Sequence, residues 1–148
     1  MDIKLIKQLR DETGVSIADI KRALEESKND TQKAKKLLKE WGLKKAAKKG
    51  DRATEQGIVS AYIHGNGMVG SLVSLACETD FVARTDDFKN LAKEIAMQVA
   101  AMNPKNAEEL MKQAYIRDPK VTIEDLIKEQ IAKLGENIQV KDFSRQTI

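Results

Sequence analysis

Cysteine, histidine and aromatic side chains are scarce in this chain of 148 residues. It contains one cysteine, Cys77, and one histidine, His64, and aromatic residues make up 4% of the sequence. A single cysteine excludes an internal disulfide bond and fits a reducing cytosol. A lone histidine without a second histidine or cysteine excludes the usual spacings of zinc ligands. We therefore expect Cys77 to be a small buried side chain and His64 to be a surface residue at the end of a hairpin.

The sequence also lacks the motifs of the common enzyme classes. It has no catalytic-triad signature, no Walker loop and no glycine-rich dinucleotide loop. No apolar run is long enough to span a membrane, and charges at positions 2, 4, 7 and 10 indicate a helix rather than a secretory signal. The net charge of +3 is too small to indicate nucleic-acid binding by itself. We expect a cytoplasmic protein that is not an enzyme, needs no cofactor and does not bind nucleic acid directly.

The apolar pattern of residues 1–44 predicts a small domain of three short helices. The first helix is expected from Ile3 to Glu12, with Gly14 as its left-handed stop. Ser16 and Asp19 form a variant capping box at the start of the second helix. Gly42 is expected to end the third. The predicted buried positions on the three helices are Leu5, Ile6 and Leu9, then Ile17, Ile20, Ala23 and Leu24, then Ala34, Leu37, Leu38 and Trp41.

Residues 45–54 are expected to be a basic linker between two domains. The basic side chains in and beside it are Lys44, Lys45, Lys48, Lys49 and Arg52. They are typical of a solvated helical linker, but they also fit contact with an acidic partner surface or with RNA. No aromatic residue is interleaved with them, so a base would have nothing to stack on. Among the functional alternatives, a protein partner is favoured.

Residues 55–148 predict an α+β domain with a small antiparallel three-stranded sheet and helices on one face. Strands are expected at 58–63, about 68–77 and 137–143, with a Gly65-Asn66-Gly67 turn between the first two. A helix capped by Asp86 or Asp87 should bury Leu91, Ile95, Val99 and Met102 before Pro104 ends it. A weaker helix is expected over about 107–115, followed by a break at Asp118-Pro119. Thr122 and Asp125 form a capping box for a last helix, which Gly135 ends.

The segment Cys77–Arg84 joins the second predicted strand to the helix that follows. A turn of this kind normally carries polar residues, yet this one contains Phe81, one of three phenylalanines in the chain. An apolar side chain on a surface turn is typical of a binding wedge. The alternative is that Phe81 folds back into the core, and spacing alone does not decide between the two.

Four carboxylates near this turn raise the question of a metal site. They are Glu78, Asp80, Asp86 and Asp87. The segment lacks the glycine and the ligand spacing of an EF-hand loop, and the last two carboxylates suit a helix N-terminus. We therefore expect no metal ion here.

Two motifs resemble the signatures of the elongation factor Ts family. The first is Leu9-Arg10-x-x-Thr13-Gly14-Val15-Ser16-Ile17, continuing through Asp19-x-Lys21-Arg22-Ala23-Leu24, and the second is Cys77–Arg84. Shorter segments at 46–49, 62–64 and 134–138 also follow the family's order. The resemblance implies a ubiquitin-associated-type three-helix domain over residues 1–44 and one copy of the family's core subdomain over residues 55–148. It also implies an exchange factor that promotes release of GDP from translation elongation factor Tu.

The resemblance assigns contacts to two groups of residues. In the family, the phenylalanine matching Phe81 enters a pocket of the GTPase domain near its magnesium and phosphate site. Asp80 matches the residue linked to disturbing magnesium coordination, while Thr79 is expected to fix the turn and Val82 to pack beneath it. Residues matching Arg10, Ile17 and Ala18 contact the partner from the N-terminal domain, although this chain lacks the methionine pair common at the last two. Lys49 would approach the partner from the linker; the alternative for it is a solvated lysine.

The chain departs from many family members in having one short core subdomain. The passage from Pro104 to Pro119 is too short for the helical hairpin or second subdomain that others carry. A single core copy suggests a homodimer formed through that subdomain. Ser74 and Ala76 also replace the family's usual Glu and Asn. A second class of function stays open, in which the three-helix domain is an adaptor that binds a protein or nascent chain. Organelles of bacterial descent are an alternative location to the cytoplasm.

Overall fold

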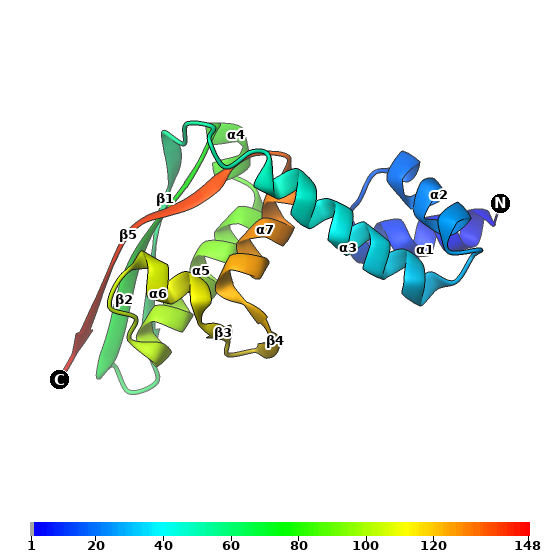
Figure 1. The fold of residues 1–148 in the computed structure, drawn as a ribbon. Helices are drawn as coiled ribbons and strands as arrows, with labels where there is room; N and C mark the ends of the chain where they lie inside the picture. The colour runs from blue at the N-terminus through cyan, green and yellow to red at the C-terminus, as the bar shows by residue number, and fades with distance from the viewer. Residues whose placement is uncertain (1) are drawn as a thin grey trace.

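The computed structural model describes residues 2–148 and divides them into a helical N-terminal part and an α+β part (Figure 1). The N-terminal part consists of α1 (Ile3–Thr13), α2 (Ile17–Glu26) and α3 (Thr31–Ala47). The α+β part contains, in chain order, β1 (Gln56–His64), β2 (Val69–Cys77), α4 (Asp80–Ala83), α5 (Asp86–Met102), α6 (Ala107–Lys112), β3 (Ala114–Tyr115), β4 (Asp118–Thr122), α7 (Ile123–Leu134) and β5 (Ile138–Thr147). The predicted α+β class is confirmed.

The three N-terminal helices surround a small apolar core, much as their sequence pattern predicts. Its buried side chains are Ile6, Leu9, Ile20, Ala23, Leu24, Ala34 and Leu38. Gly14 ends α1 with φ of 67°, and the Ser16 hydroxyl caps α2 by accepting from the Asp19 amide. One expectation was wrong: Ile17 is exposed in the first turn of α2. Trp41 packs against this core as predicted but is only half-buried, with the Arg22 guanidinium 4.3 Å from its ring centre.

Helix α3 does not end at Gly42 as expected; it continues to Ala47, so the first residues of the predicted linker are helical. The reason is long-range packing against α7. A Cβ on Gly42 would lie 3.2 Å from the Ala132 Cβ, so small residues on both helices bring their backbones close together. Ala46 is buried in the core of the α+β part. Helix α3 thereby joins the two parts directly, as Figure 1 shows.

The main sheet has the predicted antiparallel hairpin and returning strand, in the order β1-β2-β5. Strand β2 is central, and its alternation places Ser71, Val73, Leu75 and Cys77 on the buried side. Helix α5 packs on this side against β1 and β2, and α7 packs beside α5. The helices therefore cover one face of the sheet and leave the other face uncovered.

Helix α5 supplies the largest share of the α+β core. Its buried apolar side chains are Phe88, Leu91, Ala92, Ile95, Ala96, Val99 and Ala100. Thr85, rather than Asp86 or Asp87, is the N-cap, and its hydroxyl accepts from the Phe88 amide. Both aspartates lie in the first turn, where carboxylates interact favourably with the helix dipole. Met102, expected to be buried, is exposed in the last turn just before Asn103 ends the helix.

The region after α5 differs most from expectation. The predicted helix over 107–115 stops at Lys112, and the predicted break at Asp118-Pro119 lies in β4, which pairs with β3 in a second small sheet. The buried amide of Gln98 explains the change: it donates to the Ala114 carbonyl and accepts from the Ile116 amide, fixing that segment as extended. Burial and a hydrogen bond to Glu94 raise the pKa of Tyr115 to about 12, so its hydroxyl stays protonated and anchors the small sheet to α5.

Helix α7 has the ends that the sequence predicts. Thr122 and Asp125 exchange both bonds of a capping box, and Gly135 ends the helix with φ of 80°. The chain then turns directly into β5 through Gly135, Glu136 and Asn137. This turn lies next to the segment from Cys77 to Arg84, which follows β2.

Candidate functional site

The turn after β2 forms a one-turn helix, α4, that presents an aromatic side chain to solvent. Phe81 is 83% exposed, whereas Ala83 is buried and Val82 is half-buried against the core. One side of this turn therefore packs inward while the opposite side carries Phe81. The alternative in which Phe81 folds back into the core is wrong. Exposure of so large an apolar side chain has a solvation cost, so it marks this turn as a candidate contact surface.

Asp80 lies beside Phe81 in the first turn of α4. Its carboxylate is 3.2 Å from the Arg84 guanidinium, and both side chains are exposed. An exposed ion pair of this kind contributes little to stability. The Asp80 oxygens are thus accessible to a partner at little cost to the fold. Thr79 is the N-cap, and its hydroxyl accepts a hydrogen bond from the Val82 amide at 3.3 Å.

The carboxylate of Glu136, which is distant in sequence, holds this turn. Glu136 accepts hydrogen bonds from the Glu78 amide at 3.1 Å, the Thr79 amide at 2.9 Å and the Thr79 hydroxyl at 2.7 Å. In return, the Glu78 carboxylate accepts from the Asn137 amide at 2.8 Å. Sequence reasoning missed this role for Glu136, because no local spacing reveals a contact between residues 57 positions apart. The family resemblance includes the segment 134–138 but implies no structural or functional role for it.

Cys77 lies under the same turn and is buried, as expected. Its thiol donates a hydrogen bond to the Thr79 carbonyl at 3.1 Å. Burial, followed by the nearby charge of Glu136, raises the pKa of the thiol. The protonated thiol is a poor nucleophile, so Cys77 serves the structure of the turn.

The second group of predicted contacts lies apart from the first. Arg10 is exposed in the last turn of α1, and Ile17 and Ala18 are exposed in the first turn of α2. Figure 1 shows α3 separating these helices from α4. Lys49 follows α3, and its ammonium donates to the Gly135 carbonyl at 3.0 Å. The structure therefore presents two candidate surfaces, with Lys49 bound at the junction between the two parts.

Three of the four carboxylates considered for a metal site have separate partners. Glu78 binds the Asn137 amide, Asp80 faces Arg84, and Asp87 lies 3.4 Å from the Lys133 ammonium. Within residues 2–148, no three His, Cys, Asp or Glu side chains are grouped so that they could hold a metal ion. Over the same residues, no helix is both long and apolar enough to cross a membrane.

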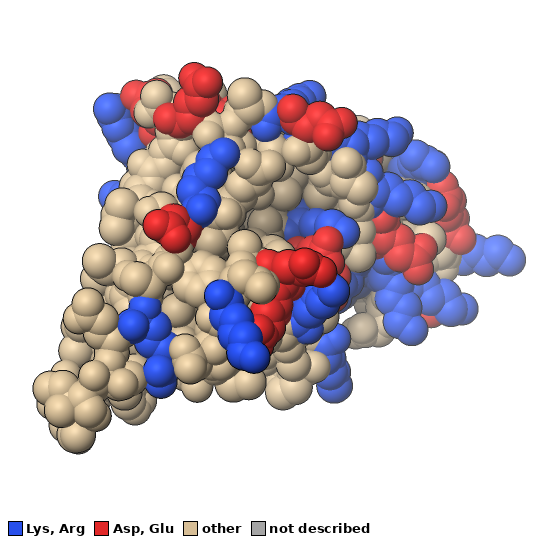
Figure 2. Space-filling view, turned by 60° about the vertical axis from the view of Figure 1, so that its left-hand side comes forward, with Lys and Arg blue, Asp and Glu red and all other residues tan. Residues whose placement is uncertain are grey.

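The outer face of the main sheet is the third notable surface. Val59, Ile63 and Leu72 are exposed there at 67%, 65% and 49%, and Met68 adds a further exposed apolar side chain at the hairpin tip. Charged side chains crowd the right-hand side of Figure 2 and are sparse only at its lower left.

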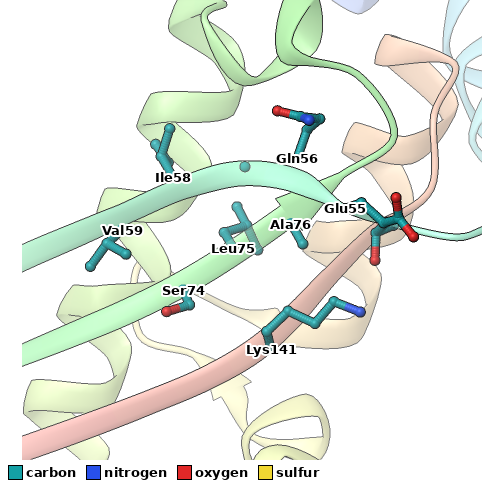
Figure 3. Close-up of a pocket in the computed structure, with 10 residues that line it drawn as sticks. Glu55, Gln56, Ile58, Val59, Ser74, Leu75, Ala76 and Lys141 are labelled. Atoms are coloured by element: carbon teal, nitrogen blue, oxygen red, sulfur yellow. The ribbon is translucent and has the colours of Figure 1, made fainter.

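A hollow of about 270 Å³ opens near one end of this outer face. Figure 3 shows Val59, Ser74 and Lys141 from three adjacent strands around it. Gly57, also in its lining, permits the close approach of β1 and β2, because a Cβ there would overlap the Leu75 carbonyl oxygen. The hollow is therefore a feature of how the strands meet, open on the same side as the apolar patch.

A helical module joined to an α+β core, with an exposed aromatic side chain on a braced turn, is the arrangement of a candidate protein-contact surface. Residues 78–148 match the family described as Elongation factor TS. The chain is 46% identical to the elongation factor Ts of Coprothermobacter proteolyticus, over 97% of this chain and 96% of that protein. It is 40% identical to that of Caldanaerobacter subterraneus (95% and 92%) and 38% identical to that of Carboxydothermus hydrogenoformans (96% and 86%). The chain belongs to the elongation factor Ts family of translation elongation factors.

The alignments also bear on the length of the chain. The one with the Coprothermobacter protein spans 189 residues, more than the 148 of this chain, so that relative carries residues with no counterpart here. This fits the short passage between Pro104 and Pro119, where α6 is followed within a few residues by the small sheet.

Proposed function

We propose that this protein is a guanine-nucleotide exchange factor that promotes release of GDP from translation elongation factor Tu, so that GTP can reload. The observation that carries the proposal is the 83% exposure of Phe81 on a turn fixed by Glu136. No covalent bond is made or broken in such a reaction, and the protein acts by binding alone. We place the reaction in the cytoplasm, where translation elongation takes place.

The exchange problem is thermodynamic. A factor that binds the nucleotide-free or distorted GTPase better than the GDP-bound form lowers the affinity for GDP, and GDP lowers the affinity for the factor by the same ratio. Such a factor needs an apolar group to insert and a rigid mount for it. The hairpin β1-β2 and helix α5 flank the turn and supply the mount.

Each residue of the turn has a separate part in this proposal. Phe81 enters a pocket near the magnesium and phosphate site, where burying it contributes roughly 1.5–3 kcal/mol. Asp80 disturbs magnesium coordination through its accessible carboxylate oxygens. Thr79 caps α4 and holds the turn, while Val82 packs beneath it. No ligand beyond the partner's own nucleotide is involved.

The N-terminal module is the second handle on the same partner. Arg10, Ile17 and Ala18 are exposed and so are accessible for contact. Lys49 is a further contact in the proposal, and its ammonium would exchange the Gly135 carbonyl for an acceptor on the partner. This second handle lies along the C-terminal half of α3, because Asp19, next to Ala18, pairs with Lys45 at 2.8 Å. The turn that carries Phe81 lies beyond that end of α3 (Figure 1), which lets one partner be held at two places.

Release of a fluorescent GDP analogue from elongation factor Tu tests the function. We expect the wild-type chain to accelerate release in proportion to its concentration until saturation. Equal amounts of an unrelated protein of similar charge are the control for nonspecific effects. Absence of acceleration at saturating concentration would show that the chain is not an exchange factor for this GTPase.

We also propose that two copies pair through the outer face of the main sheet. The exposed Val59, Ile63 and Leu72 support this, because a contiguous apolar patch on an uncovered sheet face favours association. A Leu72→Asp variant should then run at the monomer mass of 16.5 kDa in light scattering, at concentrations where the wild type runs at twice that mass. Ile116→Asp, at an exposed residue in the turn between β3 and β4, is the matched control and should stay dimeric. A monomeric wild type would contradict the pairing.

A further inference from the structure

The exposed turn needs a brace that α4 itself cannot supply. Helix α4 has four residues, and a single helical turn is unstable on its own because fixing its backbone costs more than one hydrogen bond returns. Thr79, Asp80 and Phe81 are all exposed, so apolar burial secures the turn mainly through Val82 and Ala83. The orientation of Phe81 must therefore depend on polar contacts to its N-terminal side.

We infer that Glu136 is a positioning residue for nucleotide exchange: its carboxylate clamps the backbone before Phe81 and so fixes the direction in which Phe81 is presented. The inference rests on the proposed function. Oε1 accepts from the amides of Glu78 and Thr79, and Oε2 accepts from the Thr79 hydroxyl. Three donors on two consecutive residues meet one carboxylate, and charge-assisted hydrogen bonds of this kind are stronger than neutral ones.

The loop that carries Glu136 is itself held on both sides. The Asn137 amide donates to the Glu78 carboxylate, while its side-chain nitrogen donates to the carbonyls of Gly50 and Arg52 at 3.2 and 2.8 Å. Asn137 is buried, which favours keeping all these bonds made. The Gly135 carbonyl accepts from the Lys49 ammonium. Glu136 therefore projects from a fixed point where the connector, the α7–β5 turn and the Phe81 turn meet.

Loss of the clamp should affect one kinetic quantity more than another. Docking through the N-terminal module sets the concentration of factor needed for half-maximal exchange. Insertion of Phe81 within the docked complex sets the maximal rate. A turn that samples other orientations presents Phe81 correctly for a smaller fraction of the time, so the maximal rate falls by that fraction.

The test compares three variants in release of a fluorescent GDP analogue from elongation factor Tu. Glu136→Ala should lower the maximal rate roughly tenfold, with the half-saturating concentration within about twofold of wild type. Glu136→Gln keeps an oxygen that can accept from both amides and should retain at least about half of the rate. Glu108→Ala removes an exposed carboxylate paired with Lys112 on α6 and should change nothing. A Glu136→Ala variant with wild-type exchange would overturn the inference.

Amide hydrogen exchange gives a readout that does not depend on activity. In Glu136→Ala the amides of Glu78 and Thr79 should exchange at least about tenfold faster, while the amide of Leu75 in the central strand β2 stays protected. Loss of protection at Leu75 as well would mean that the variant has lost its fold and that the clamp is not a local device, which overturns the inference. If the wild type fails to accelerate GDP release from elongation factor Tu, the proposed function is wrong, and so is the role of Glu136 in exchange. The amide hydrogen exchange measurement then still decides whether Glu136 holds the turn.

Discussion

Replacing Phe81 with alanine is expected to lower the maximal rate of GDP release from elongation factor Tu by roughly 10- to 100-fold. The phenyl ring is 83% exposed in the free protein, so its removal takes no packing from the fold. In the proposed complex the ring would be buried, and losing roughly 1.5–3 kcal/mol of apolar burial corresponds to about one to two powers of ten in rate. The measurement is release of a fluorescent GDP analogue at saturating factor. Thermal unfolding of the variant should match that of the wild type.

The same variant separates the two classes of function. An adaptor that binds through the three-helix domain would not need Phe81, and residues 1–44 would suffice for binding. Met102→Ala is a suitable control, since it removes an exposed apolar side chain from the last turn of α5, away from the turn. Unchanged GDP release by the Phe81→Ala variant, with Met102→Ala also unchanged, would reject the wedge mechanism even if the wild type is active.

Local sequence signals predicted most of the elements correctly, because each depends on neighbouring residues. The glycine turn at 65–67 and the alternation around it gave the β1-β2 hairpin, and Thr122 with Asp125 gave the start of α7. Errors arose where a distant contact overrides the local signal. Gly42 serves the approach of α3 to α7 instead of ending a helix. The side chain of Gln98 turns the residues after Lys112 into a strand.

The candidate site shows the same division between local and distant information. Sequence position identified the turn and its phenylalanine, but it could not decide whether Phe81 points outward or inward. That outcome depends on the burial of Val82 and Ala83, which together fix the opposite side of the short helix. The role of Glu136 in holding the turn could not be predicted, for a different reason. A glutamate after a helix-ending glycine is an ordinary surface residue until the fold brings it to Thr79.

Phe88 lies seven residues after Phe81 and is buried where Phe81 is exposed. Substituting each in turn therefore tests whether one ring is buried and the other exposed in solution. Phe88 is fully buried in the first turn of α5 and is among the largest side chains of the core. Phe88→Ala should lower the free energy of unfolding by about 3–5 kcal/mol, because it removes the ring and leaves a cavity. Alanine is a better helix former, and the Phe88 amide can still donate to Thr85, so the local structure of α5 cannot account for such a loss.

Urea unfolding followed by circular dichroism measures this difference, with Phe81→Ala as the matched control at the same residue type. Phe81→Ala should stay within about 0.5 kcal/mol of the wild type, since surface substitutions away from special features usually do. Phe88→Ala should thus lower the free energy of unfolding, whereas Phe81→Ala should lower the rate of nucleotide exchange. Equal losses of stability in both variants would mean that Phe81 is packed in solution. In that case the exposed wedge, and with it the mechanism built on it, would not describe this protein.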